Sequence, residues 1–153
     1  MSIAKDGLAR WHGIVGRMTD ETLDAMLADN VVFHSPVVHT PQEGKALTKL
    51  YLMAAFNVFP GDAPSEDTKP PSGSASLVKP ESKFEYVREV VGDRDAVLEF
   101  RTEIDGISVN GVDMIRWNDE GLIEDFKVMI RPLKAIQKIH GQMARMLEAM
   151  KPS

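Results

Sequence analysis

The chain of 153 residues contains no cysteine. Disulfide bonds, a thiolate nucleophile and a cysteine-ligated metal site are therefore excluded, and this composition suits a reducing compartment. A chain of this length buries roughly 70% of the surface that its unfolded form exposes, so a hydrophobic core suffices without cross-links. We therefore expect a single domain that spans residues 1–153.

Clusters of basic side chains and long apolar runs are also missing. The 18 lysines and arginines are scattered among 23 acidic residues, and the formal net charge is -5. A polyanion partner needs a basic stripe, and a membrane span needs about 18 consecutive apolar residues. Lys5, Asp6 and Arg10 interrupt any apolar leader at the start of the chain. We therefore expect a cytoplasmic protein that binds neither nucleic acid nor a membrane.

The first third of the chain has helical periodicity. Apolar residues recur three and four positions apart in the expected first helix, namely Leu8, Trp11, Val15 and Met18. Gly7 and Gly13 each weaken this helix by about 1 kcal/mol relative to alanine. Thr19 is a favourable N-cap for a second helix. The buried side of that helix is expected to contain Leu23, Met26 and Leu27.

A short strand and a third helix are expected next. Residues 31–33 predict the strand, which Ser35-Pro36 ends because proline cannot donate to a β-ladder. Gly44 leads into a helix with apolar residues on one side. Residues 58–83 then predict a long loop, either a solvated, partly disordered insertion or a lid over a site. This loop is rich in proline, with Pro60, Pro64, Pro70, Pro71 and Pro80.

The last part of the chain reads as strands followed by one helix. The ranges 84–91, 96–104, 107–117 and 122–131 predict an antiparallel meander. Pro132 is expected to open an additional helix over 132–150. The apolar stripe of that helix consists of Leu133, Ile136, Ile139, Met143, Met146, Leu147 and Met150. Helices first and strands afterwards indicate an α+β domain with helices packed on a curved sheet.

One carboxylate, Asp113, lies among side chains that are expected to be buried. It belongs to a hairpin whose turn contains Asn118 and Gly121, and Gly121 is expected to supply a positive φ. An apolar environment disfavours the charged form of a carboxyl group and raises its pKa. Asp113 is therefore expected either to donate a hydrogen bond to a ligand or to pair with a neighbouring tyrosine, arginine or histidine.

Three segments resemble ketosteroid isomerase, a member of the nuclear transport factor 2-like superfamily, which also includes the SnoaL-like polyketide cyclases. They are LARW at 8–11, MLADNVVFHSP at 26–36 and VDMIRWNDEGLIEDF at 112–126. The resemblance implies a cone-shaped α+β domain with an internal cavity. It also implies a homodimer that pairs through the outer face of the sheet.

The resemblance also implies roles for three residues. Asp113 falls where the isomerase keeps a protonated acid that donates to an oxyanion. Ser35 replaces the general base, and Trp11 replaces the tyrosine that helps to bind the oxyanion. A serine hydroxyl without a base beside it cannot remove a proton from carbon, so steroid isomerisation by that mechanism is not expected. His34 and His39 are the candidate bases near this position.

We expect the cavity to bind a small apolar or mixed organic molecule without a metal or another cofactor. The expected ligand-binding residues are Trp11, Phe33, Ser35, Leu98, Phe100, Val109, Ile115, Phe126 and Val128. Three functions remain open. The domain is an isomerase, cyclase or lyase, a non-catalytic carrier or sensor, or a dimeric interaction module.

Overall fold

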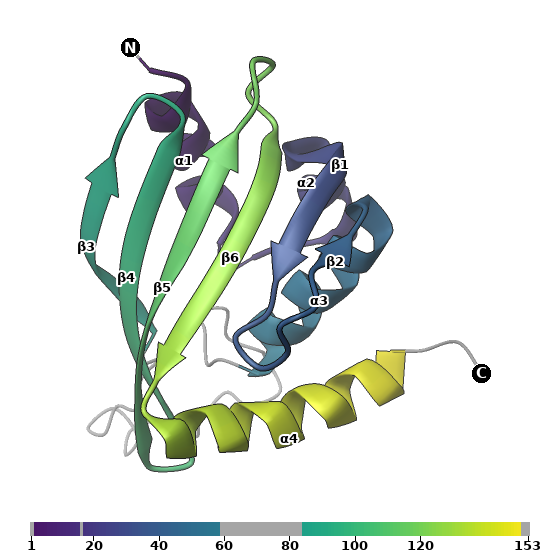
Figure 1. The fold of residues 1–153 in the computed structure, drawn as a ribbon, viewed down its shortest axis with the longest axis vertical. Helices are drawn as coiled ribbons and strands as arrows, with labels where there is room; N and C mark the ends of the chain where they lie inside the picture. The colour runs from purple at the N-terminus through teal and green to yellow at the C-terminus, as the bar shows by residue number, and fades with distance from the viewer. Residues whose placement is uncertain (1, 16, 59–83, 151–153) are drawn as a thin grey trace, which may run out of the picture.

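The computed structural model describes residues 2–15, 17–58 and 84–150 of the chain. In sequence order the elements are α1 (Ile3–Ile14), α2 (Asp20–Met26), β1 (Leu27–His34), β2 (Gln42–Glu43), α3 (Lys45–Val58), β3 (Glu85–Val91), β4 (Asp95–Ile104), β5 (Ile107–Trp117), β6 (Ile123–Arg131) and α4 (Leu133–Met150). The strands form one curved, six-stranded sheet in the order β2-β1-β6-β5-β4-β3. Helices α1, α2 and α3 lie on one face of the sheet, and α4 crosses one end of it (Figure 1). The expected α+β class is confirmed.

The boundaries of several expected elements differ from the prediction. Helix α1 stops at Ile14, because Val15 is already extended, so Val15 and Met18 lie beyond the helix. Leu27 begins β1 instead of continuing α2, since it pairs with Ile123 of β6 and is fully buried there. Tertiary pairing thus overrides the helical spacing. Strand β1 runs parallel to β6, whereas the four later strands form the expected antiparallel meander.

Two further differences concern the middle of the chain. Strand β2 was not expected, and it consists of a two-residue pairing with β1. Helix α3 includes Val58, the first residue of the expected loop. The rest of that loop, 59–83, lies outside the described residues.

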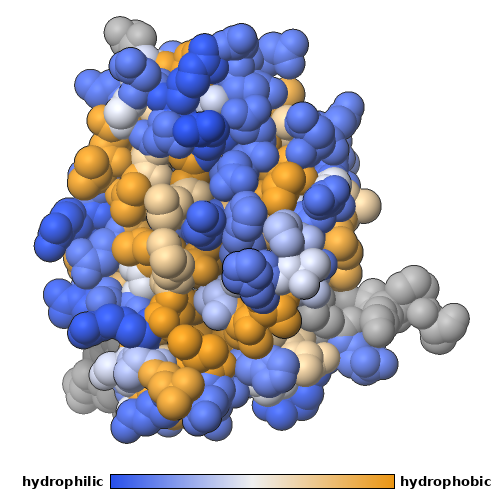
Figure 2. Space-filling view, viewed as in Figure 1, coloured by the Kyte–Doolittle hydropathy of each residue, from blue (hydrophilic) through white to orange (hydrophobic). Residues whose placement is uncertain are grey.

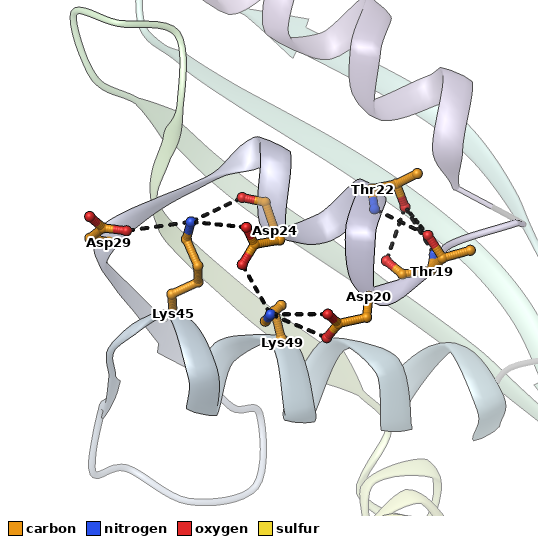
Figure 3. Close-up of polar contacts among 7 residues, drawn as sticks. All are labelled: Thr19, Asp20, Thr22, Asp24, Asp29, Lys45 and Lys49. Carbon is orange, nitrogen blue, oxygen red and sulfur yellow. Dashed lines mark hydrogen bonds and ion pairs between the residues drawn. The ribbon is translucent and has the colours of Figure 1, made fainter.

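The expected N-cap of α2 is confirmed. The Thr19 hydroxyl accepts a hydrogen bond from the Thr22 backbone N–H at 3.1 Å, and the Thr22 hydroxyl accepts one from the Thr19 N–H at 2.9 Å. Ion pairs then hold α2 against α3, as Figure 3 shows. The Lys49 Nζ lies 3.0 Å from Asp24 Oδ1 and 3.2 Å from Asp20 Oδ1. Helix α3, which these ion pairs join to α2, also carries one wall of the pocket.

The β5–β6 hairpin has the expected turn. Gly121 adopts a φ of 80°, and its N–H donates to the Asn118 carbonyl at 3.0 Å. Strand β4 alternates as expected between buried and more exposed residues. Residues such as Leu98 and Phe100 therefore face the helices, whereas Glu99 and Arg101 lie on the outer face of the sheet.

The buried side chains of the described residues form two clusters. The larger joins α1 and α2 to the sheet, and the smaller joins α4 to the far ends of β4 and β5. In the second cluster, Ala135 and Ile139 of α4 pack with Phe100. Leu133, expected in the buried stripe, is 67% exposed because it lies in the first turn, before the helix reaches the core. The side chains of Met146, Leu147 and Met150 lie outside the described residues.

Candidate functional site

A largely apolar pocket lies between the two clusters. Its volume is about 170 Å³. Helices α3 and α4, the segment after β1 and the inner face of the sheet all contribute walls. The lining residues are Phe33, Ser35, Pro36, Val37, Val38, Tyr51, Leu52, Ala55, Phe84, Phe100, Asp113, Phe126, Val128, Ile130, Ile139, His140, Met143 and Ala144. Helix α4 closes one side of the pocket. The pocket therefore depends on a helix that lies outside the three segments that resemble ketosteroid isomerase.

Asp113 is the buried acid in this pocket. Strand β5 places it between Leu98 of β4 and Val128 of β6, and its side chain is only 5% exposed. Burial raises the pKa of Asp113 to about 7, although the hydrogen bond from Tyr86 acts in the opposite direction. No lysine or arginine is among the described residues that line the pocket. Near neutral pH the group therefore divides between a neutral donor and a carboxylate.

A hydrogen-bonded chain of three side chains orients Asp113. The Trp11 Nε1–H donates to the Tyr86 hydroxyl at 3.2 Å, and that hydroxyl donates to Asp113 Oδ2 at 2.7 Å. An indole N–H can only donate, so the direction of the chain is set from Trp11 towards Asp113. Burial, followed by the nearby charge of Asp113, raises the pKa of Tyr86 well above its usual range, which keeps it a donor. Asp113 Oδ1 is therefore the oxygen that can carry the proton and act as a donor.

Five of the nine expected ligand-binding residues line the pocket, namely Phe33, Ser35, Phe100, Phe126 and Val128. The other four are not among the residues that line this pocket. Leu98, Ile115 and Trp11 belong to the larger core cluster, and Val109 belongs to the smaller one. Strand alternation identifies the residues on the inner face of the sheet. It does not show which of them pack against helices and which of them border the pocket.

Neither expected histidine reaches the pocket. The His34 Nε2 lies 2.9 Å from Asp125 Oδ1. His34 directly follows the pocket residue Phe33 along β1, so its side chain points to the opposite face of the sheet. His39 is exposed and is not among the lining residues. Ser35 does line the pocket, and its hydroxyl accepts a hydrogen bond from the Val37 N–H at 3.0 Å, which stabilises a local turn.

Three polar residues of this site were not named from the sequence, although a tyrosine, arginine or histidine was expected as a possible partner of Asp113. Tyr86 binds Asp113 from a strand 27 residues earlier, and Tyr51 and His140 line the pocket from α3 and α4. One signal was available for Tyr86, because a buried carboxyl needs a donor and the chain has only two tyrosines. For His140 the signal was its place beside Ile139 in the apolar stripe of the last helix.

Within the described residues, no three histidine, cysteine, aspartate or glutamate side chains gather as a metal ion would require. None of the helices in the described ranges combines the length and apolar character of a membrane span.

Of the comparisons with known proteins, the one with solved structures identifies the superfamily of this chain. No family model matches the sequence, and no curated protein matches it. Among solved structures, a steroid delta-isomerase from Pseudomonas aeruginosa is 30% identical, with a TM-score of 0.78 over 97% of this chain and 94% of that chain. A bacterial protein with a cystatin-like fold from Silicibacter pomeroyi DSS-3 is 27% identical, with a TM-score of 0.71 over 91% of this chain and 83% of that chain.

A third structure supports the same superfamily. An NTF2-like protein of unknown function from Mesorhizobium loti is 18% identical, with a TM-score of 0.61 over 85% of this chain and 92% of that chain. At that identity the likeness concerns the fold alone. Together with the match to the steroid delta-isomerase over nearly its whole length, these structures show that the chain belongs to the nuclear transport factor 2-like superfamily.

Proposed function

We propose that the pocket binds a compact, mostly apolar carbonyl compound and that the protein acts on it as an isomerase or cyclase. The observation that carries this proposal is Asp113, a buried carboxyl in the pocket wall whose pKa is raised to about 7. A neutral carboxyl at such a place donates a hydrogen bond to a carbonyl oxygen, and the bond strengthens as that oxygen gains negative charge during enolisation. Perturbed acids in apolar pockets are frequent at functional sites.

The pocket also supports a limit on the size of the compound. Its volume of about 170 Å³ is close to the ~150 Å³ of engineered apolar cavities that hold a benzene molecule. Drug-sized ligands occupy pockets of roughly 300–1,000 Å³. A ligand built on one ring therefore fits the described walls better than a four-ring steroid does.

Binding of a phenol tests the role of Asp113. Titration calorimetry with para-nitrophenol at mildly acidic pH should show weaker binding for Asp113→Asn and at least a tenfold loss for Asp113→Leu. An amide still donates a hydrogen bond, although a weaker one, whereas leucine donates none. A lost hydrogen bond to a buried ligand oxygen costs about 1.5–3 kcal/mol, and 1.4 kcal/mol is tenfold in affinity.

Circular dichroism of both variants provides the control for folding. Leucine is close to aspartate in size and suits the apolar wall, so the fold should remain. Equal affinities of the wild type and Asp113→Leu would show that Asp113 does not contact the ligand and would remove the basis of the proposal.

A second candidate function is a carrier or sensor without catalysis. The observation that favours it is Ser35, which stands where the isomerase has its base and whose hydroxyl accepts the Val37 N–H. A carrier would retain Asp113-dependent binding of para-nitrophenol but would not exchange protons on carbon. Titration calorimetry with para-nitrophenol, together with NMR detection of proton exchange on carbon in deuterium oxide, therefore separates the candidates.

We also propose that the outer face of the sheet is buried between two copies of the chain. Figure 2 shows apolar surface running over the middle strands on that face. The register aligns Val90 and Val97 with Met114, and Val112 with Met129, in two neighbouring rows. Val90 is 59% exposed and Met129 is 48% exposed in the single chain. Large exposed apolar patches commonly mark protein interfaces.

Sedimentation at micromolar concentration tests this proposal. The wild type should sediment as a dimer, whereas Met129→Lys should give a species of 17.0 kDa, because a lysine would be buried without a partner. Leu47→Lys is the matched control, since Leu47 is an exposed apolar residue of α3, on the other face of the sheet. A monomeric wild type, or dimeric Met129→Lys, would contradict the proposed interface.

A further inference from the structure

The proposed chemistry requires a base that the pocket does not have at the expected position. Ser35 cannot remove a proton from carbon by itself, and His34 and His39 do not line the pocket. The missing group must therefore come from another wall. Among the described lining residues, the ionisable side chains are Tyr51, Asp113 and His140.

Tyr51 and Asp113 are poor choices for this role. The Tyr51 ring stacks on Phe33 at a centroid distance of 5.6 Å and belongs to the apolar lining. Asp113 is needed in its protonated form as the donor to the carbonyl oxygen. Its Oδ2 accepts the Tyr86 hydroxyl at 2.7 Å and its Oδ1 is the donor to the carbonyl oxygen, so both oxygens are engaged and a separate base is needed for the carbon.

His140 has the position and the chemistry that are required. Its neighbours Ile139 and Met143 line the pocket with it, and the buried Ala135 and Ile139 anchor this part of α4. The His140 side chain is exposed, so it lies at the rim of the pocket, whereas Asp113 lies in the buried wall. Within the described residues, His140 has no hydrogen bond or ion pair that would occupy its ring nitrogens. Imidazole is the commonest general base in enzymes.

We propose that His140 of helix α4, which lines the same pocket as Asp113, is the general base that takes a proton from the carbon next to the ligand's carbonyl group. This inference rests on the proposed function of the pocket. The C–H electron pair becomes the C=C bond of an enol, and the carbonyl oxygen receives the hydrogen bond, or the proton, of Asp113. His140 then returns its proton to a carbon of the same ligand, so no oxidant or further reactant is consumed. The substrate class is a one-ring ketone with an acidic hydrogen beside the carbonyl.

Proton exchange on carbon tests this assignment directly. Cyclohexanone in deuterium oxide, followed by proton NMR, should lose its hydrogens next to the carbonyl faster with the wild type than with buffer. His140→Gln should reduce the enzyme-dependent rate by about 100-fold, the lower range of general-base effects. Binding of para-nitrophenol should change less than twofold, because glutamine retains a polar side chain of similar size at the rim.

Two further variants separate a chemical role from a structural one. Added imidazole should restore exchange to His140→Ala but should not accelerate the wild type to the same degree. Lys138→Gln is the matched control, since it removes a basic group from the same helix at a residue that pairs with Asp105 and does not line the pocket. Its exchange rate should equal that of the wild type.

The outcomes distinguish this inference from the proposed function. Wild-type exchange that falls in Asp113→Leu but persists in His140→Gln would overturn the role of His140 and leave Asp113 in place. Absence of exchange in the wild type would overturn the role of His140 as well, and phenol binding that still depends on Asp113 would then support a carrier. Phenol binding that is independent of Asp113 would overturn the proposed function itself.

Discussion

The free energy of unfolding should fall by about 4 kcal/mol between pH 4 and pH 8 because of Asp113 alone. Burial raises the pKa of Asp113 from 3.8 to about 7 in the folded protein, whereas the unfolded chain has the ordinary value. Each pKa unit of difference corresponds to about 1.4 kcal/mol. Between these two pKa values the folded state holds a proton that the unfolded state has lost, so raising the pH favours unfolding. Above the folded pKa the effect is complete and stability levels off.

Urea denaturation across this pH range measures the effect as a difference between two proteins. Asp113→Asn keeps an acceptor for the Tyr86 hydroxyl but cannot ionise, so its unfolding free energy should lack the Asp113 component. Subtracting the two curves removes the contribution of other groups, such as Asp24, whose pKa is lowered by its hydrogen bond from Lys49. Parallel curves for the wild type and Asp113→Asn would mean that Asp113 titrates normally in the folded state.

Tyr86→Phe gives a second test, because this variant should change the pKa of Asp113 in a defined direction. The hydrogen bond from Tyr86 lowers the pKa of Asp113, so removing it should raise that pKa further above 7. The Asp113-dependent loss of stability should then continue to higher pH than in the wild type. Carbon-13 NMR of the Asp113 carboxyl in both proteins follows the same change directly.

The sequence predicted those parts of the fold that depend on local chemistry. The Thr19 cap, the Gly121 turn and the alternation of β4 each follow from a few neighbouring residues, and the structure confirms them. The parallel pairing of β1 with β6 was missed because it joins residues about ninety positions apart. Leu27 shows the physical reason, since its helical spacing was real but pairing with Ile123 buries it completely.

Only the part of the site that depends on a local pattern was predictable from the sequence. Asp113 is recognisable as a polar residue at an inward position of an apolar strand, which is a local pattern. Its partner Tyr86 depends on the register between β3 and β4, which shifts at an irregularity between Tyr86 and Arg88. His140 depends on how α4 docks across the end of the sheet. Periodicity identifies the apolar face of a helix but not the surface that this face meets.

Gly7→Ala should destabilise the protein by about 3 kcal/mol, the upper range for overpacking a core with one methyl group. Helical propensity alone predicts the opposite sign. In the structure, however, a Cβ at residue 7 would lie 2.2 Å from Trp117 Nε1 and 2.3 Å from Trp117 Cε2. The Trp117 side chain is only 1% exposed and is packed in the larger cluster, so helix α1 would have to move away from the sheet. That movement would also displace Trp11, one turn further along α1, and disturb its hydrogen bond to Tyr86.

Gly13→Ala is the matched control in the same helix. A Cβ there meets nothing within 4 Å, so only the propensity effect remains, and the variant should be stabilised by up to about 1 kcal/mol. Urea denaturation of the two variants should therefore shift the midpoint in opposite directions. In a Trp117→Leu background the cost of Gly7→Ala should shrink, because the smaller side chain leaves room for the methyl group. A stabilised Gly7→Ala, or an unchanged cost in that background, would contradict the close packing of α1 on the Trp117 indole and leave helical propensity as the dominant effect at both glycines.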